Sequence, residues 1–231
     1  MNLDIAYPIA WLVLFIISVT FHEAAHAWVA KKGGDLTAYA GGQVSLNPLP
    51  HIKRQPWGMV VFPLVSSFLL GWPFGYASTP YDRSWAQKHP RRAAWMAAAG
   101  PLANLSIAVV LMLVVRLGIQ TGILLEPESA GFEHIVDAGF GPPGLSVIIS
   151  MLFTLNLILF VLNLLPLPPL DGSGIIALFL PENAARKYSA IISNPSFGFI
   201  GLLLAWQVFT PLFDVIFLGA INLMYWPTRY S

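Results

Sequence analysis

Long apolar stretches separated by short polar connections dominate the chain, and their lengths predict membrane-spanning helices. Residues 8–30 form the first stretch. Two lysines and then two glycines follow it, a combination typical of a helix end at a membrane surface. Further apolar stretches cover residues 93–117, 144–165 and 197–224. About 20 apolar residues suffice to cross the hydrocarbon core of a bilayer, so each stretch is long enough to span it.

Residues 55–81 interrupt this pattern, because they carry no charge but are broken by prolines and glycines. Lysines and arginines flank the segment on both sides, and such residues favour the cytoplasmic side of a membrane. Both ends of the segment are then on one side, so we predict a re-entrant segment instead of a further span. The loop 118–143 has no lysine or arginine, which predicts that it lies on the opposite side.

Residues 35–48 have a different character from the rest of the chain. Short stretches with some alternation flank Gly41 and Gly42, and β-branched or aromatic residues recur, which favours a β-hairpin. The predicted fold is therefore an all-α polytopic membrane protein with about 4–6 membrane segments and a small β-hairpin or sheet after the first helix. We expect a single membrane-embedded domain over residues 1–231, since no internal repeat or linker is evident.

Composition supports this fold and narrows the chemistry. Hydrophobic residues make up 56% of the 231 residues and charged residues only 10%, whereas soluble domains carry about 25% charged residues. The formal net charge of +1 gives no indication of a nucleic-acid partner. The chain has no cysteine, so disulfides and thiolate chemistry are excluded and any metal must be bound by His, Asp or Glu.

The end of the first apolar stretch carries the unusual sequence FHEAAHAWVA, residues 21–30. In a helix, positions i and i+4 lie on one face, so His22 and His26 can present two imidazoles to one zinc ion, with Glu23 beside the metal. Zinc lowers the pKa of bound water to about 7, and a carboxylate can accept its proton during attack on a carbonyl. The simpler alternative is a polar helix end at the lipid headgroups, but ionisable groups within membranes usually mark function.

A catalytic zinc ion usually has three protein ligands and an open position, so a third ligand must come from elsewhere in the chain. Asp171 follows the third apolar stretch in NLLPLPPLDGSG, where prolines exclude a continuous helix and glycines permit close approach. The alternative role for Asp171 is to cap the segment that follows it. The other candidates are histidines in predicted loops, namely His51, His89 and His134.

Three motifs together resemble the site-2 protease family of intramembrane zinc metalloproteases. They are HEAAH at 22–26, AGPLAN at 99–104 and NLLPLPPLDG at 163–172. The motifs occur in the family's order and cover nearly the whole hydrophobic part of the chain. The similarity is greatest to compact, single-domain prokaryotic members without PDZ or CBS domains.

The resemblance implies a set of site residues and one zinc ion per chain. It makes His22, His26 and Asp171 the zinc ligands and Glu23 the general base. Asn163 matches the family's motif asparagine, which holds the substrate backbone or the oxyanion, and a neutral amide donor suits the charge of a tetrahedral intermediate. A hydrogen bond between helices is the alternative for Asn163.

Three further polar residues are left with open or no roles. Asn104 ends the Gly-Pro motif, where a packing role and a role at the site are both open. His51, in NPLPHI, either shapes a loop or belongs to the site. Asn156 lies seven residues before Asn163, on nearly the same helix face, and receives no role.

The family also carries a small sheet near its active site that offers an edge to an unwound substrate, and the resemblance makes Thr37–Leu46 its counterpart. A protease needs an extended substrate because a helix hides its peptide bonds, and a sheet edge binds such a segment through the backbone. We therefore expect a membrane-protein substrate, bound as an extended strand near Thr37–Leu46, and a lipid bilayer as the surroundings.

These inferences predict a multi-pass zinc endopeptidase that hydrolyses peptide bonds in or near transmembrane segments, as in regulated intramembrane proteolysis. The expected location is a prokaryotic cell (inner) membrane, with the active site nearer the cytoplasmic side. One alternative is a metal-ion or proton transporter that uses the same His/Glu/Asp cluster, although transporters often contain repeated halves. A di-iron membrane oxidase is disfavoured, because only two of the five histidines are clustered. A non-catalytic membrane scaffold is also disfavoured, because every motif of the set is intact.

Overall fold

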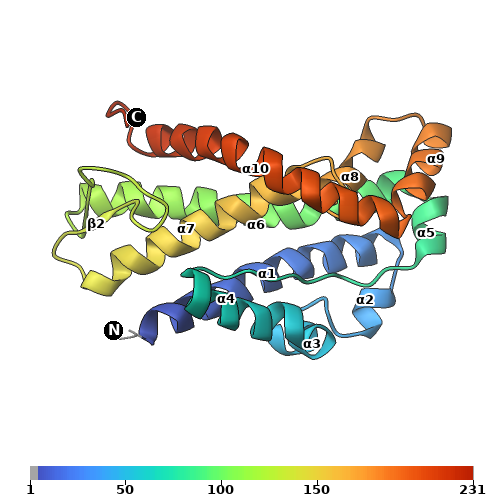
Figure 1. Cartoon of the computed structure of the whole chain (residues 1–231), viewed down its shortest axis with the longest axis horizontal. Coiled ribbons are helices and arrows are strands. Elements are labelled where there is room, and N and C mark those ends of the chain that lie inside the picture. The colour runs from blue at the N-terminus through green and yellow to red at the C-terminus, as the bar shows by residue number, and fades with distance from the viewer. Residues whose placement is uncertain (1–4, 231) are drawn as a thin grey trace.

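The computed structural model describes residues 5–230 and consists mostly of helices (Figure 1). Four of the described helices are long and apolar enough to cross a membrane. They are α1 (Ala6–Gly33), α6 (Pro90–Gln120), α7 (Pro143–Leu164) and α10 (Pro195–Met224). Their positions match the four predicted apolar stretches and confirm an all-α polytopic membrane fold.

Shorter elements fill the connections between these four helices. They are α2 (Thr37–Ala40), α3 (Pro48–Arg54), the π-helix η1 (Trp57–Val61), α4 (Phe62–Leu70), α5 (Arg83–Lys88), α8 (Asp171–Ile175), the 3₁₀-helix η2 (Ile176–Leu178) and α9 (Glu182–Ile192). Two short strands, β1 (Leu124–Leu125) and β2 (Asp137–Ala138), pair antiparallel between α6 and α7.

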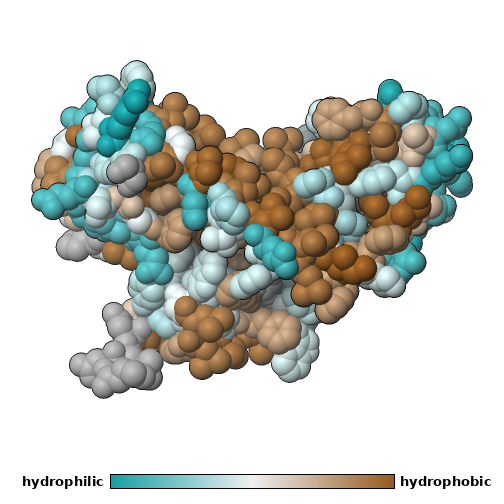
Figure 2. Space-filling view, turned by 45° about the horizontal axis from the view of Figure 1, so that its top comes forward, coloured by the Kyte–Doolittle hydropathy of each residue, from teal (hydrophilic) through white to brown (hydrophobic). Residues whose placement is uncertain are grey.

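Helix α6 is the central element, because it packs against α1, α7 and α8. Small residues permit this close packing, and Ala97, Ala98 and Gly100 of α6 are all buried. The apolar side chains on the outer faces of the bundle remain exposed, and α10 is exposed along most of its length. Figure 2 shows this as apolar surface across the middle of the molecule, with polar residues gathered at its two ends. In a bilayer, such surface faces lipid.

The predicted re-entrant segment enters and returns at one end of the molecule (Figure 1). Together η1 and α4 form an apolar helix from Trp57 to Leu70. At 1.5 Å per residue this helix is about 21 Å long, which is too short to span about 30 Å of hydrocarbon. Gly71 then adopts a left-handed φ of 85°, and the following chain runs back without regular structure to α5.

The prediction of a β-hairpin within residues 35–48 is wrong. Thr37 begins the short helix α2, and its backbone N–H and its hydroxyl both donate to the Asp35 carboxylate. Asn47 likewise caps α3 by accepting the N–H of Leu49 at 3.0 Å. Asp35 and Asn47 thus bind nearby backbone N–H groups and favour short helices, which competes locally with extended structure. The predicted fold also included a small sheet after the first helix. This sheet exists, but its strands are β1 and β2, between α6 and α7.

The basic residues gather at the end of the molecule that carries α2, α5 and α9. Eight of the twelve lysines and arginines belong to α5, to α9, to the end of α1 or to the start of α6, all at this end. Both chain termini and the loop with β1 and β2 lie at the other end (Figure 1). This distribution agrees with the predicted sidedness of the loops.

Candidate metal centre

Helix α1 places three of the predicted site residues inside the bundle. His22, Glu23 and His26 lie in its second half and are only 6%, 4% and 5% exposed. One helical turn separates the two histidines, so their rings meet at 4.6 Å between centroids, and their Nε2 atoms are 2.9 Å apart. Three ionisable side chains are therefore buried on a helix that is otherwise mostly apolar.

Asp171 comes from a distant part of the sequence and completes the cluster. Its Oδ2 lies 3.0 Å from His22 Nε2 and 3.2 Å from His26 Nε2. Asp171 is the first residue of α8, but its carboxylate makes no capping hydrogen bond, so the capping alternative does not describe it. Although burial raises the pKa of Asp171, the neighbouring histidines lower it more strongly, to well below its ordinary value.

The cluster has the dimensions of a zinc site. Ligand atoms of a tetrahedral zinc ion, each 2.0–2.1 Å from the metal, are about 3.3 Å apart. Among the described residues, His22, His26 and Asp171 form the one group of three potential ligands close enough to share an ion. The position of Gly100 in α6 supports this fit, because an added Cβ would lie 2.3 Å from His26 Nε2 and 2.5 Å from His22 Nε2. A glycine there keeps free the space that a metal needs.

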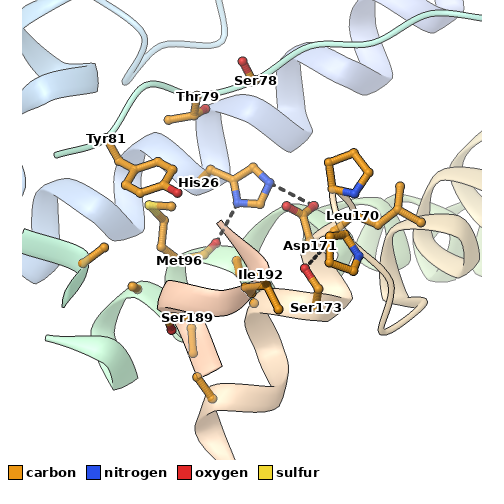
Figure 3. A pocket seen from close by; sticks show the side chains of 18 of the residues that line it. His26, Ser78, Thr79, Tyr81, Met96, Leu170, Asp171, Ser173, Ser189 and Ile192 are labelled. Atoms are coloured by element: carbon orange, nitrogen blue, oxygen red, sulfur yellow. Dashed lines mark hydrogen bonds and ion pairs between the residues drawn. The ribbon is translucent and has the colours of Figure 1, made fainter. Parts of the chain in front are cut away.

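Hydrogen bonds on the far side of each ring set which nitrogen faces the cluster. His26 Nδ1 lies 2.6 Å from the carbonyl oxygen of Met96. A carbonyl oxygen only accepts, so Nδ1 carries a proton and Nε2 is the ring nitrogen that faces the cluster. Figure 3 shows His26 held in this way between Met96 and Asp171.

The tautomer of His22 is set by a longer hydrogen-bond chain. Asn156 Nδ2 donates to the carbonyl oxygen of Leu152 at 2.8 Å, which fixes its amide orientation. Its Oδ1 accepts from Asn104 Nδ2 at 2.9 Å, and Asn104 Oδ1 then lies 2.6 Å from His22 Nδ1. Because that oxygen only accepts, His22 Nδ1 is the donor. Nε2 of each histidine therefore faces the cluster, where its unprotonated form can bind a shared metal ion.

Asn104 and Asn156 are both fully buried, and neither had a defined role from sequence alone. The signal available for Asn104 was its place in the AGPLAN motif. Asn156 Nδ2 also donates to Ser18 Oγ at 2.9 Å, and Ser18 lies one helical turn before His22. A polar residue at that spacing on a membrane helix was the only indication of this network in the sequence.

Glu23 is oriented by a residue that the sequence analysis missed. Thr79 Oγ1 lies 2.7 Å from Glu23 Oε2 and 2.9 Å from the Glu23 backbone oxygen, so the hydroxyl donates to Glu23. Thr79 belongs to the unstructured return from α4, and Figure 3 shows this segment passing over the site. Nothing in the local sequence distinguished Thr79, because the contact joins residues 56 positions apart.

The remaining predicted residues are not part of the group of His22, His26 and Asp171. Asn163 lines the same cavity, and its Nδ2 donates to the carbonyl oxygen of Leu159 at 3.0 Å. His51 is buried, with Nε2 3.0 Å from the Ser45 carbonyl oxygen, so it contacts its own loop and not the cluster. His134 pairs with Asp137 at 3.1 Å in the loop between α6 and α7.

A cavity of about 450 Å³ opens onto the metal cluster. Its walls come from the helices α1, α6, α8 and α9 and from the segment that precedes α5. Figure 3 shows Thr79, Tyr81, Ser173 and Ile192 around the cavity. Glu23 and Asn163 also line this cavity. The metal cluster, the Glu23 carboxylate and the Asn163 amide therefore share one open cavity that a peptide can enter.

Comparison with known proteins places the chain in a family. The family model described as peptidase family M50 matches residues 10–206, which is most of the chain. The chain belongs to peptidase family M50, the site-2 protease family. The predicted resemblance is therefore confirmed, and membership of a peptidase family gives no support to the transporter alternative.

Individual relatives agree with this family. The chain is 34% identical over 220 residues to a protein of Bacillus subtilis (strain 168) named "Putative zinc metalloprotease YwhC", covering 94% of this chain and 89% of that relative. It is 28% identical to "Putative zinc metalloprotease Rip2" of Mycolicibacterium smegmatis, covering 99% of this chain and 79% of the relative. A Rip2 protein of Mycobacterium tuberculosis is 27% identical, with 95% and 75% covered. No solved structure matches the chain significantly.

Proposed function

We propose that this member of peptidase family M50 is a zinc endopeptidase that hydrolyses peptide bonds in or near transmembrane segments of other membrane proteins. The observation that carries the proposal is the cluster of His22, His26 and Asp171 with Glu23 beside it, buried among membrane-length helices. Each polar group there is costly to bury in an apolar environment, and together they supply the parts of a metalloprotease site.

His22, His26 and Asp171 are the proposed ligands of one zinc ion per chain. When bound, a zinc ion there lowers the pKa of water to about 7 and polarises the carbonyl of the bond to be cut. The two histidines contribute neutral Nε2 donors, because their Nδ1 protons are held by Met96 and Asn104. Asp171 contributes one negative charge, which offsets part of the charge of the ion.

Glu23 is the proposed general base. Its carboxylate lines the cavity one position after the first zinc ligand, where it can accept a proton from the attacking water. Thr79 holds Oε2 through its hydroxyl, so the other carboxylate oxygen is left to take the proton. After attack, the same carboxyl group can deliver that proton to the leaving amine.

Asn163 is the proposed donor to the oxyanion. One N–H of its amide is used by the Leu159 carbonyl oxygen, and the amide carries a second N–H. This second N–H suits the negative charge that develops on the scissile carbonyl oxygen, and its removal is expected to lower the rate more than substrate binding.

We propose that the substrate lies beside the segment 73–81, in place of the region Thr37–Leu46, where no strand forms. Ser78 and Thr79 of this segment line the cavity, and within the described residues their backbone N–H groups have no hydrogen-bond partner. Free backbone N–H groups can bind an extended peptide by strand addition. The basic residues near the cavity favour the cytoplasmic side of a prokaryotic cell (inner) membrane for this end.

The proposal is tested with purified protein reconstituted into lipid vesicles together with a model substrate that contains one transmembrane helix. We expect cleavage that a zinc chelator abolishes and added zinc restores. Glu23→Gln should retain zinc and lose cleavage by about 100-fold or more, because only the proton acceptor is removed. Asp171→Ala should lower bound zinc, as measured by metal analysis. Full turnover by Glu23→Gln, or undiminished zinc in Asp171→Ala, would show the assignment to be wrong.

A further inference from the structure

A second cavity, of about 600 Å³, lies at the end of the bundle where α6 and α7 are connected. It is distinct from the cavity at the metal cluster, with which it shares no lining residue. Aromatic rings form much of its wall, contributed by Trp11, Trp72, Phe132, Phe209 and Phe213. The same wall contains the carboxylates of Glu133 and Asp214 and the hydroxyl of Thr154.

The two carboxylates have no cationic partner in the described chain. Asp214 belongs to the membrane-length helix α10, where an ionised carboxylate is costly unless a positive charge accompanies it. None of the ion pairs between described residues includes Asp214 or Glu133, and the wall contains no lysine or arginine. The one histidine of the wall, His134, is paired with Asp137 at 3.1 Å. The cavity wall therefore carries two acidic side chains without a lysine or arginine beside them.

Thr154 is a second and independent indication of a polar ligand. Its side chain is on the cavity wall, the residue is only 2% exposed, and its Oγ1 has no hydrogen-bond partner among the described residues. One turn earlier on α7, Ser150 Oγ accepts the N–H of Ile135 at 3.1 Å and is satisfied. A buried hydroxyl without a partner is unfavourable, and a ligand that donates a hydrogen bond removes this cost.

These groups together fit an organic cation. Carboxylates and a hydroxyl oxygen accept hydrogen bonds, and aromatic faces attract ammonium and guanidinium groups. A metal ion is a poorer fit, because these side chains do not converge into a group of three ligands as the cluster at His22 does. The volume also exceeds that of a bare ion, so a lysine or arginine side chain with its aliphatic stem is the size of ligand expected.

One segment of chain joins this cavity to the metal centre. Trp72 lines the outer cavity, whereas Ala77, Ser78 and Thr79 of the same unstructured return line the active-site cavity. Thr79 is seven positions after Trp72, so this stretch is at most about 25 Å long. A substrate that lies along this segment and is cut at the metal centre therefore reaches the outer cavity with its other end.

We propose that the outer cavity binds a lysine or arginine of the substrate on the side of the cut bond that faces away from the cytoplasm. This inference rests on the proposed function and adds a specificity element to it. A distance of up to about 25 Å corresponds to about seven residues in extended form and about sixteen in a helix. The preferred substrate carries its basic residue within this interval, and Glu133 and Asp214 recognise the charge.

The experiment uses reconstituted protein and a set of model substrates with a single arginine moved stepwise along the outer side of the cut bond. We expect cleavage efficiency to rise about tenfold when the arginine lies within the interval, relative to glutamine at the same place. Asp214→Asn with Glu133→Gln should remove this preference and leave cleavage of the glutamine substrate unchanged. Glu128→Gln is the matched control, because Glu128 lies in the same loop but outside this cavity.

The outcomes separate this inference from the proposed function. If no substrate is cut, the proposed function fails. If all substrates are cut equally well, or if the preference for arginine survives in the double variant, the protease assignment stands and the outer cavity does not bind a basic residue. If arginine is preferred at every position alike, the recognition is not at a fixed site and the inference is again overturned.

Discussion

Gly100→Ala gives the sharpest test of the metal centre, because it adds one methyl group at a known place. The new Cβ would lie 2.3 Å from His26 Nε2 and 2.5 Å from His22 Nε2, whereas real Cβ atoms keep at least 3.0 Å from other heavy atoms. One ring or the backbone of α6 must then move by about 0.7 Å. Zinc–ligand distances tolerate only about ±0.2 Å, so we expect zinc affinity to fall by about 100-fold or more.

Zinc affinity is measured by competition with a chelator of known affinity in detergent, and cleavage is measured in parallel. Gly219→Ala is the matched control, since it is the same substitution in a membrane-length helix and its Cβ meets no atom within 4 Å. The control should keep wild-type zinc affinity. Alanine favours a helix over glycine by about 1 kcal/mol, so loss of helix α6 is not the expected cause of any defect. Unchanged zinc binding by Gly100→Ala would refute the location of the metal.

Three further predictions concern the surroundings of the site and the topology. Thr79→Val leaves the proposed general base without its donor, so kcat should fall about 10-fold to 100-fold while bound zinc stays constant, and an unchanged kcat would contradict this role. Asn104→Leu should lower zinc affinity by about 10-fold to 100-fold in chelator competition, because it removes the partner of His22 Nδ1. Asn163→Leu should slow cleavage and keep zinc. Equal zinc affinities of the two variants would show that Asn104 does not orient His22 for the metal. Because the chain has no cysteine, Lys88→Cys and Glu128→Cys can be labelled singly, and an impermeant maleimide should reach them from opposite sides of the membrane.

The four membrane helices were predictable because their signal is local. Each depends on a long run of apolar residues, and the structure places a helix on every one of them. Asp171 was one candidate for the third ligand because of its proline- and glycine-rich surroundings, and the family motifs gave it that role, since no periodicity connects residues 145 positions apart. Spacing along one helix, in contrast, was enough to bring the two histidines together.

The failures of the sequence analysis have two physical causes. Thr37–Leu46 contains residues common in strands, but the Asp35 carboxylate accepts hydrogen bonds from Thr37 and forms a turn where the short helix α2 begins. This local hydrogen bonding therefore outweighed a weak strand pattern. Thr79 and Asn156 were missed for another reason, because their partners lie on other elements and become visible only when those elements pack.

The proposed metal centre would join parts of the chain that packing and a few hydrogen bonds otherwise hold together. Two donors come from α1 and one from α8, with α6 between them as a spacer of small residues. A bound ion there acts as a cross-link that can be removed reversibly, in a chain that has no covalent one. Chelation is then expected to loosen the attachment of α8 as well as to stop catalysis. We therefore expect metal supply to affect the amount of correctly assembled protein as well as its rate of cleavage.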